Sequence, residues 1–249
     1  MKNSWKSEEG GFSASRLPPD TSPAGEDFAL SLARLRRLPD EDYWRECFRR
    51  FRQTRGWSEE KMERLGRLAS ACGEEQAACF AGESVEELYA ARGLTLRELE
   101  PPPPGAMELF ALYEAPGTVS LRSDLLREAD EYLRSAGLDT LLGGRSCREV
   151  ILAHEFYHDL ECSEGSAVFT AAYRERSGLL GLQEQVPALG EIGAMSFARR
   201  LLSLDWNPFL LDCVILYPRN PGAAEAIAGR LLARQDSGER SEQEEEKRI

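Results

Sequence analysis

Apolar residues recur three and four positions apart over the first third of the chain, which is the period of an amphipathic helix. Pro39 and Gly56 interrupt this pattern and mark breaks between helices. Ser58 is suited to cap the third helix, and Gly73 is suited to end it. The pattern predicts helices over residues 26–38, 40–56, 58–72 and 84–93.

Residues 25–100 are therefore expected to form an all-helical N-terminal region. Segment 84–100 within it has a faint helix-turn-helix cadence, but its second half does not carry the row of basic side chains that contacts DNA phosphates. DNA binding is accordingly not favoured. Residues 1–24 are rich in Ser, Gly, Pro and charge without periodicity, so they are predicted to be a disordered tail.

The pattern changes after 101-PPPPG-105, which predicts a stiff extended connector. Residues 107–114 and 118–122 are predicted to be two short strands, because apolar residues flank an Ala-Pro-Gly turn. A helix is expected over 123–137. In the less regular stretch that follows the next helix, 166-SAVFTAAY-173 could be a third strand or part of an insertion.

Toward the C-terminus the helical period returns over residues 188–204 and 222–235, and the apolar segment 209–218 between them is expected to be buried. The acidic run 236–249 is predicted to be a disordered tail. The fold class is therefore α+β and mostly helical. A small sheet of about three strands should pack beside the helix that carries the histidines.

Composition narrows the classes of function. The 249 residues are 42% hydrophobic, enough for a sizeable core, and the net charge of −12 disfavours direct binding to nucleic acid. No apolar run is long enough to cross a membrane, and the first residues lack a secretory pattern, so we expect a soluble, cytoplasmic protein. The six cysteines have no paired spacing and are expected to be reduced thiols.

The two histidines of the chain lie four residues apart in 146-SCREVILAHEFYHDLEC-162. Ser146 and Glu149 form a capping-box pattern that begins a helix just before them. On a helix, His154 and His158 share one face and can bind one ion, while Glu155 lies about 100° around the axis, beside that ion. This H-E-x-x-H spacing predicts a zinc site with Glu155 as the general base.

A catalytic zinc ion needs a third protein ligand, and no histidine remains to supply it. Cys162 lies about 12 Å from His154 along a helix, too far to bind the same ion. Glu191, on a separate downstream helix, is the favoured ligand, although a glutamate near a helix N-terminus is also favoured by the helix dipole alone. Weaker alternatives are Asp159, Glu161, Asp205 and Asp212.

Two motifs in this order resemble the ImmA/IrrE family of compact zinc metallopeptidases. The first is 154-HEFYH-158, and the second is E-x-x-A-x-x-F-A-x-x-L-L over residues 191–202. The similarity extends over about residues 84–208, and segment 107–126 resembles the family's sheet. The resemblance implies a minimal zincin-like fold, with residues 101–235 as the metallopeptidase domain.

The resemblance also implies a gluzincin-type site with one Zn²⁺ per chain. His154, His158 and Glu191 would be the metal ligands and Glu155 the catalytic base. Members of the family often cut a specific protein partner, so the implied substrate is an intracellular protein such as a transcriptional repressor.

The residues indicate further parts of such a site. Tyr113 and Tyr173 are candidate donors to the oxyanion, whereas Tyr157 faces away from the motif face of its helix and is expected to be packed. Strand 118–122 could bind an extended substrate by edge addition.

Two other functions remain open from the sequence. The first is a non-catalytic zinc-binding module whose helical region docks a partner protein. The presence of Glu155 weighs against it, since a structural site has no use for a base. The second is an acidic helical interaction protein without metal, which the histidine spacing makes the least favoured.

Overall fold

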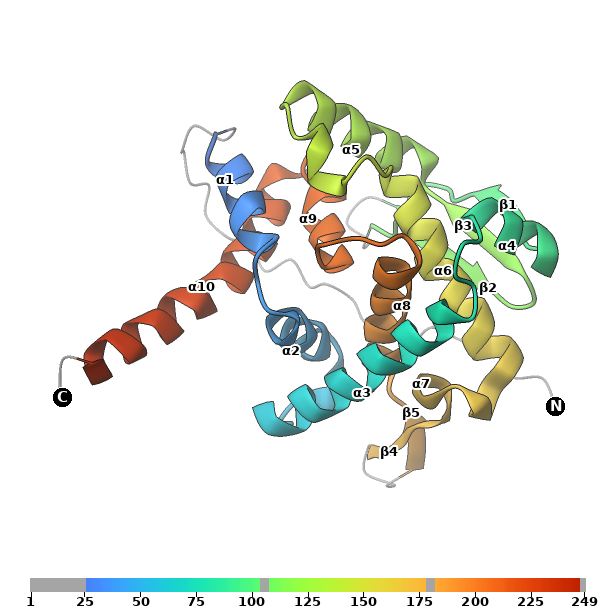
Figure 1. Cartoon of the computed structure of the whole chain (residues 1–249), viewed down its shortest axis with the longest axis horizontal. Coiled ribbons are helices and arrows are strands. Elements are labelled where there is room, and N and C mark those ends of the chain that lie inside the picture. Colours follow the sequence, from blue (N-terminus) through green and yellow to red (C-terminus); the bar gives the residue numbers. More distant parts are fainter. Residues whose placement is uncertain (1–25, 104–107, 178–181, 247–249) are drawn as a thin grey trace.

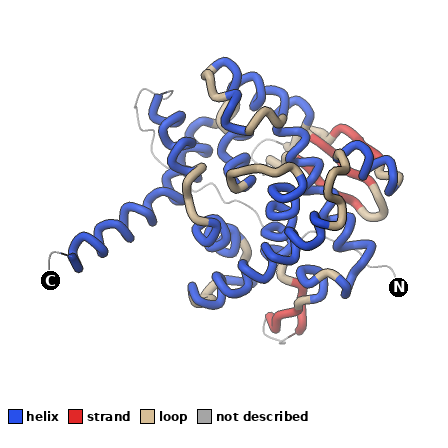
Figure 2. The backbone as a smooth tube through the Cα atoms, viewed as in Figure 1, coloured by secondary structure: helices blue, strands red, loops and turns tan. Residues whose placement is uncertain are grey.

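Most of the chain is helical, as its apolar period predicts, and the computed structural model describes residues 26–103, 108–177 and 182–246. The predicted fold class is confirmed: helices dominate, and the strands form a small mixed sheet and a separate hairpin (Figures 1 and 2). The helices are α1 (Glu26–Leu35), α2 (Asp40–Arg50), α3 (Glu59–Ala78), α4 (Val85–Arg92), α5 (Ser123–Ser135), α6 (Cys147–Glu164), α7 (Phe169–Ala172), α8 (Pro187–Leu201), α9 (Leu211–Leu216) and α10 (Pro221–Glu246).

Local capping signals account for several helix boundaries. The Ser58 side chain accepts a hydrogen bond from the backbone N–H of Lys61 at 3.2 Å, which begins α3 as predicted. Ser84 and Glu87 form a complete capping box at the start of α4. Gly93 ends α4 in the left-handed conformation at φ 67°, which a glycine adopts without strain.

The three-stranded sheet contains β1 (Thr95–Glu98), β2 (Ala111–Glu114) and β3 (Thr118–Leu121), in the order β1-β3-β2. The expectation of helix up to residue 100 is therefore wrong at β1. This strand contains the helix formers Leu, Arg and Glu, so its local propensity favours a helix, and parallel pairing with β3 overrides that propensity. The sheet thus combines a strand of the predicted N-terminal region with two strands that follow the proline run.

The sheet order also corrects the predicted site of substrate pairing. Strand β3 is central, because it pairs with β1 on one side and β2 on the other. It has no edge left for an added strand, so the prediction that segment 118–122 binds substrate by edge addition is wrong. The outer edges of the sheet belong to β1 and β2.

Segment 166–173 does not form the strand that its apolar residues suggested. It contains the 3₁₀ turn Gly165–Ala167 and the short helix α7 instead. The extended backbone comes later, in the antiparallel hairpin of β4 (Arg174–Ser177) and β5 (Leu182–Gln185). Both strands are mostly polar, so they lack the alternation by which a half-buried strand is recognised. Lys61 holds the hairpin against α3 through a 2.7 Å ion pair with Glu175.

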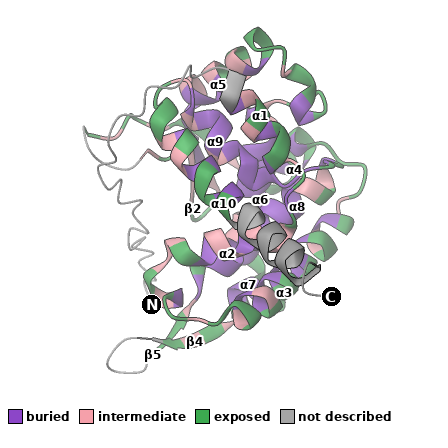
Figure 3. Cartoon of the chain, turned by 90° about the vertical axis from the view of Figure 1, so that its left-hand side faces the viewer, coloured by how far each residue is buried: buried purple, intermediate pink, exposed green. Residues whose placement is uncertain are grey.

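Helices α6, α8 and α9 form much of the interior, where buried residues are concentrated (Figure 3). Helix α3 crosses α8 very closely at Gly73, which was predicted to end α3 but lies inside it. A Cβ at this position would lie 2.1 Å from the carbonyl oxygen of Gly193. The glycine is therefore needed for the close approach of two helix backbones.

Gly73→Ala should destabilise the protein strongly, because the added methyl group meets backbone that cannot move independently. We expect a loss of about 3 kcal/mol in the free energy of unfolding, measured by urea denaturation. Gly229→Ala is the matched control, since nothing lies within 4 Å of its added Cβ in α10. That change should leave stability unchanged or raise it by up to about 1 kcal/mol. Equal stability of the two variants would contradict the close crossing.

The C-terminal segment differs from its prediction. Helix α10 continues to Glu246, so most of the segment predicted to be disordered, 236–249, is helical. Residues 236–246 are rich in the strong helix formers Glu, Gln and Arg, which accounts for the extension of α10 beyond its apolar first part. Its final turns run away from the other helices (Figure 1). The predicted N-terminal tail, 1–24, lies outside the described residues.

No described helix combines the length and the hydropathy that crossing a membrane requires. All six cysteines are unpaired, as expected for reduced thiols.

Candidate metal centre

Helix α6 presents the histidine pair from a buried, firmly anchored position. Its start is capped twice: the Ser146 hydroxyl accepts the N–H of Glu149 at 3.1 Å, and the Asp130 carboxylate accepts the N–H of Cys147 at 2.9 Å. The predicted N-cap is thus confirmed. The helix then runs to Glu164, slightly beyond its predicted end at residue 161. This anchoring fixes where the histidines lie in the fold.

The two imidazoles face each other on one side of α6. The Nε2 atoms of His154 and His158 are 3.1 Å apart. His154 is buried, with 7% of its side chain exposed, and His158 is 20% exposed. Two ring nitrogens therefore converge on one point, and His158 is the more exposed of the two histidines.

Glu191 approaches the same point from the neighbouring helix α8. Its Oε2 lies 3.5 Å from Nε2 of His154, and its Oε1 lies 3.7 Å from Nε2 of His158. These three side chains are the one group of potential ligands close enough to hold a metal ion among the described residues. The carboxylate favoured as third ligand is thus brought to the histidine pair.

The other candidates for the third ligand have different partners. Asp205 forms a 2.6 Å ion pair with Arg36 near the surface, and Asp212 pairs with Arg50 at 2.5 Å. Cys162 is exposed and is not part of the ligand group. None of these side chains joins the candidate metal centre.

Glu155 is buried directly beside these three side chains, in the middle of α6. Desolvation by burial raises its pKa, the charges of the two imidazoles lower it, and the charge of Glu191 raises it further. The backbone amide of Tyr113 faces the carboxylate and favours its ionised form. The net direction is upward, which suits a group that must both accept and release a proton near neutral pH.

Strand β2 brings that amide to Glu155 through its register. The N–H of Arg122 donates to the carbonyl of Phe110, so the polar backbone groups of residues 110, 112 and 114 point toward β3. Those of Ala111 and Tyr113 point to the opposite edge. Sequence reasoning missed this contact, because it depends on how the sheet docks on α6.

The tyrosines proposed as oxyanion donors have other hydrogen bonds. The Tyr113 hydroxyl donates to Oδ1 of Asp159 at 2.9 Å and accepts the N–H of Gly117 at 3.3 Å. The Tyr173 hydroxyl donates to Glu175 at 2.9 Å. Neither hydroxyl contacts the three candidate ligands, so the structure does not bring these two hydroxyl groups into the site.

The Tyr113 hydroxyl instead links β2 to helix α6. Asp159, which accepts its hydroxyl, lies on α6 one turn beyond Glu155 and is buried. The Arg92 guanidinium of α4 lies 3.9 Å from the same carboxylate. Asp159 therefore acts as an anchor between three elements, which accounts for its absence from the ligand group.

The ligands form a tightly coupled electrostatic group. Burial opposes ionisation of Glu191, yet the adjacent His154 and the charge of His158 outweigh it and lower the pKa of Glu191 to about 2. Burial also opposes protonation of His158, but the Glu161 and Glu191 carboxylates outweigh it and raise the pKa of His158 to about 10. Negative charge around the imidazoles thus favours a cation at this point.

Metal binding should depend on pH because a metal ion and a proton compete for His158. Its pKa is raised from 6.5 to about 10, so the protonated ring stabilises the metal-free protein fully below pH 6.5 and loses that effect as pH rises through 10. Since Zn²⁺ needs an unprotonated nitrogen, its affinity should rise over the same interval. The increase in Tm caused by added Zn²⁺ should be larger at about pH 8 than at about pH 6. An increase that does not depend on pH would contradict this competition.

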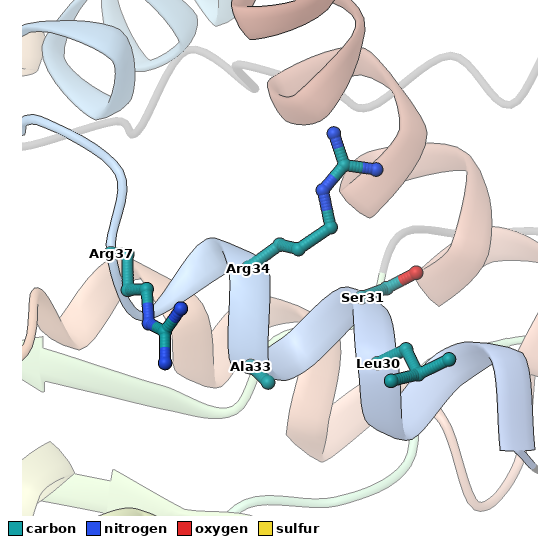
Figure 4. Close-up of a pocket in the computed structure, with 5 residues that line it drawn as sticks. All are labelled: Leu30, Ser31, Ala33, Arg34 and Arg37. Atoms are coloured by element: carbon teal, nitrogen blue, oxygen red, sulfur yellow. The ribbon is translucent and has the colours of Figure 1, made fainter.

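Two open surface hollows lie away from the candidate centre. One lies on α1 and another on α3, and neither contains a ligand of the candidate centre. Figure 4 shows Arg34 of α1 and Arg37 of the turn after it extending in opposite directions at the first of these. The five residues that line it are Leu30, Ser31, Ala33, Arg34 and Arg37.

In comparisons with known proteins, the chain matches no protein-family model, no curated protein and no solved structure.

Proposed function

We propose that the chain is a zinc-dependent metallopeptidase with His154, His158 and Glu191 as metal ligands and Glu155 as catalytic base. The observation that carries this proposal is the convergence of three side chains beside a buried carboxylate. The two Nε2 atoms are 3.1 Å apart, Oε2 of Glu191 lies 3.5 Å from that of His154, and Oε1 of Glu191 lies 3.7 Å from that of His158. The resemblance of the two motifs to the ImmA/IrrE family supports the same assignment.

These separations suit zinc. Zinc bonds of about 2.05 Å at tetrahedral angles separate two ligand atoms by about 3.3 Å. The 3.1 Å between the two imidazole nitrogens is close to that value. When Glu191 contributes one oxygen, the three ligand atoms lie within 4.8 Å of one another, so a rotation of the Glu191 side chain would bring that oxygen to both nitrogens. One carboxylate and two imidazoles also leave a fourth position open, as a catalytic zinc site requires.

A bound Zn²⁺ would supply a Lewis acid that polarises the scissile carbonyl and makes water nucleophilic near neutral pH. Glu155 takes the proton from the attacking water at its carboxylate and delivers it to the nitrogen of the leaving amine. Its burial prepares it for both roles, because a raised pKa makes the protonated form a more persistent donor. The Tyr113 amide favours the ionised form before attack.

The substrate that suits this site is an extended segment of a protein. Strand β2 is the edge strand nearest Glu155, and the outward backbone groups of Ala111 could pair with an added strand. We propose that the partner is an intracellular protein such as a transcriptional repressor, as the family resemblance implies. Six unpaired cysteines suit the reducing cytoplasm.

A non-catalytic zinc-binding module is the alternative. It is favoured by one observation: the hydroxyls of Tyr113 and Tyr173 are both engaged away from the ligands, so neither is aimed at an oxyanion. The buried Glu155 favours catalysis, because a carboxylate with a raised pKa beside three ligands has no role in holding structure.

Metal removal separates the two functions. The chain is incubated with a library of proteome-derived peptides, and new termini are identified by mass spectrometry. Cleavage should stop when zinc is removed by a chelator and return on addition of about one equivalent of Zn²⁺. Cleavage that survives complete zinc removal would contradict a metallopeptidase. Stoichiometric zinc without any cleavage of the library or of candidate repressors would favour the interaction module.

A further inference from the structure

A buried carboxylate lies behind the metal centre and contacts His158 on the side away from the other ligands. Oε2 of Glu161 lies 2.9 Å from Nδ1 of His158. Because an ionised carboxylate can only accept, the imidazole nitrogen is the donor. With Nδ1 engaged by Glu161, Nε2 is the nitrogen that a metal ion would bind once its proton is displaced, and Nε2 is the atom that faces His154 and Glu191.

The second oxygen of this carboxylate is held as firmly as the first. Oε1 of Glu161 accepts the hydroxyl hydrogen of Thr170 at 2.5 Å. The Thr170 oxygen is also 2.8 Å from the Tyr157 hydroxyl, which lies 3.5 Å from the Cys72 sulfur on α3. Glu161, Thr170 and Tyr157 are all buried. The carboxylate is thus one link in a buried chain of hydrogen bonds rather than a free surface group.

Two glycines of α8 make room for this chain. A Cβ at Gly190 would lie 2.9 Å from Oε2 and 3.1 Å from Oε1 of Glu161. A Cβ at Gly193 would lie 2.6 Å from the Tyr157 hydroxyl oxygen. The helix that supplies the ligand Glu191 is therefore shaped, one residue earlier, to fit the carboxylate behind His158.

The other histidine has no such support. Nδ1 of His154 is buried and has no hydrogen-bond partner among the described residues. No hydrogen bond therefore orients the His154 ring through Nδ1, whereas Glu161 orients the His158 ring through that atom.

We propose that Glu161 is the positioning residue of the metal centre: it fixes the orientation and tautomer of His158 through Nδ1, and Thr170 and Gly190 hold it in place. This inference rests on the metal centre of the proposed function. Carboxylates that accept the second imidazole hydrogen of a metal ligand typically contribute 10- to 100-fold in metal affinity, so about this range is expected here. Sequence reasoning weighed Glu161 only as a possible ligand, and its contact with His158 at three-residue spacing gives it a different role.

The first test compares Glu161→Gln and Glu161→Ala with wild type. Zn²⁺ affinity is measured by competition with a chromogenic chelator, and Co²⁺-loaded protein gives the visible spectrum of the centre. We expect Glu161→Gln to weaken Zn²⁺ binding about 10-fold, because the amide keeps a hydrogen-bond acceptor but loses the charge. Glu161→Ala should weaken it by up to about 100-fold, and both should alter the Co²⁺ spectrum.

Glu164→Gln is the matched control. This residue lies on the same helix and undergoes the same loss of charge, but it is exposed and pairs with Arg92 at the surface. Its Zn²⁺ affinity should stay within about 2-fold of wild type, and its Co²⁺ spectrum should be unchanged.

Gly190→Ala tests the geometry without changing any charge or ligand. The new methyl group should displace the Glu161 carboxylate, since its nearest neighbours are the two carboxylate oxygens at the end of a flexible side chain. We expect weaker Zn²⁺ binding by several-fold and a shifted Co²⁺ spectrum, with a smaller change in the Tm of the zinc-free protein than Gly73→Ala causes.

Two results would overturn the inference. If Glu161→Gln and Glu161→Ala bind Zn²⁺ with wild-type affinity and an unchanged Co²⁺ spectrum, Glu161 does not position His158. If Glu164→Gln has the same effect as Glu161→Gln, the effect is one of general charge. A wild-type chain that binds no Zn²⁺ would refute the proposed metal centre itself and this inference with it.

Discussion

Glu155→Gln should retain zinc and lose peptide cleavage, with kcat reduced by about 10²- to 10⁴-fold, the range for loss of a general base. Glutamine has nearly the same shape as glutamate but cannot accept a proton from water at neutral pH. Glu155 is not one of the three convergent ligands, so zinc affinity should change little. The measurement is the initial rate on peptides that the wild type cleaves, at equal zinc content.

Glu149→Gln is the control, because it lies on the same helix and its side chain pairs with Arg145 at the exposed surface. It should cleave at the wild-type rate. A Glu155→Gln variant that cleaves as fast as wild type would show that another group is the base. A variant that loses its zinc would instead make Glu155 part of the metal-holding set.

Glu191→Ala should weaken Zn²⁺ binding by more than about 100-fold, a larger effect than loss of a hydrogen-bond partner of a ligand. Among the residues that the structure describes, the change removes the one carboxylate with an oxygen within 4 Å of each Nε2 atom, at 3.5 and 3.7 Å. Two imidazoles on one helix cannot complete a catalytic zinc site. Affinity is measured by chelator competition, and circular dichroism checks that the variant is folded.

Asp205→Asn is the matched control for this ligand. Asp205 is a carboxylate that sequence reasoning kept as a competitor, and it forms a surface ion pair with Arg36 instead. Its removal should leave Zn²⁺ affinity unchanged. Wild-type affinity in Glu191→Ala, or a loss of affinity in Asp205→Asn, would mean that the third ligand was assigned to the wrong carboxylate.

The chemistry-bearing residues were more predictable than the fold around them. His154 and His158 lie on one helix, so their relation follows from the helical period, and Ser146 fixes where that helix starts. Glu191 could be favoured because no third histidine exists. Its distance to the pair could not be predicted, since that depends on how α8 packs against α6.

Features that depend on long-range pairing were missed. Strand β1 contains helix formers, and only its partner β3 makes it a strand. The sequence does not distinguish a glycine that ends a helix from a glycine that allows two helices to pack closely. Gly73 allows the close packing of α3 and α8. The hairpin of β4 and β5 is polar on both faces, so no alternation revealed it.

The contacts that support the candidate metal centre could not be predicted from the sequence either. Glu161 was visible three residues after His158, but its buried partner Thr170 and the space at Gly190 arise only when α6, α7 and α8 pack together. The outward amide of Tyr113 depends on the register of β2. Such contacts join residues that are distant in the chain, so local patterns do not report them.

The metal content of the purified chain tests the central claim most directly. The protein is stripped of metal, incubated with excess Zn²⁺ and desalted, and its zinc content per chain is then measured by elemental mass spectrometry. Wild type should retain about one equivalent of zinc per chain, as one site predicts, and His154→Ala should retain far less. A wild-type chain without bound zinc, or a His154→Ala variant that retains as much as wild type, would contradict the metal centre.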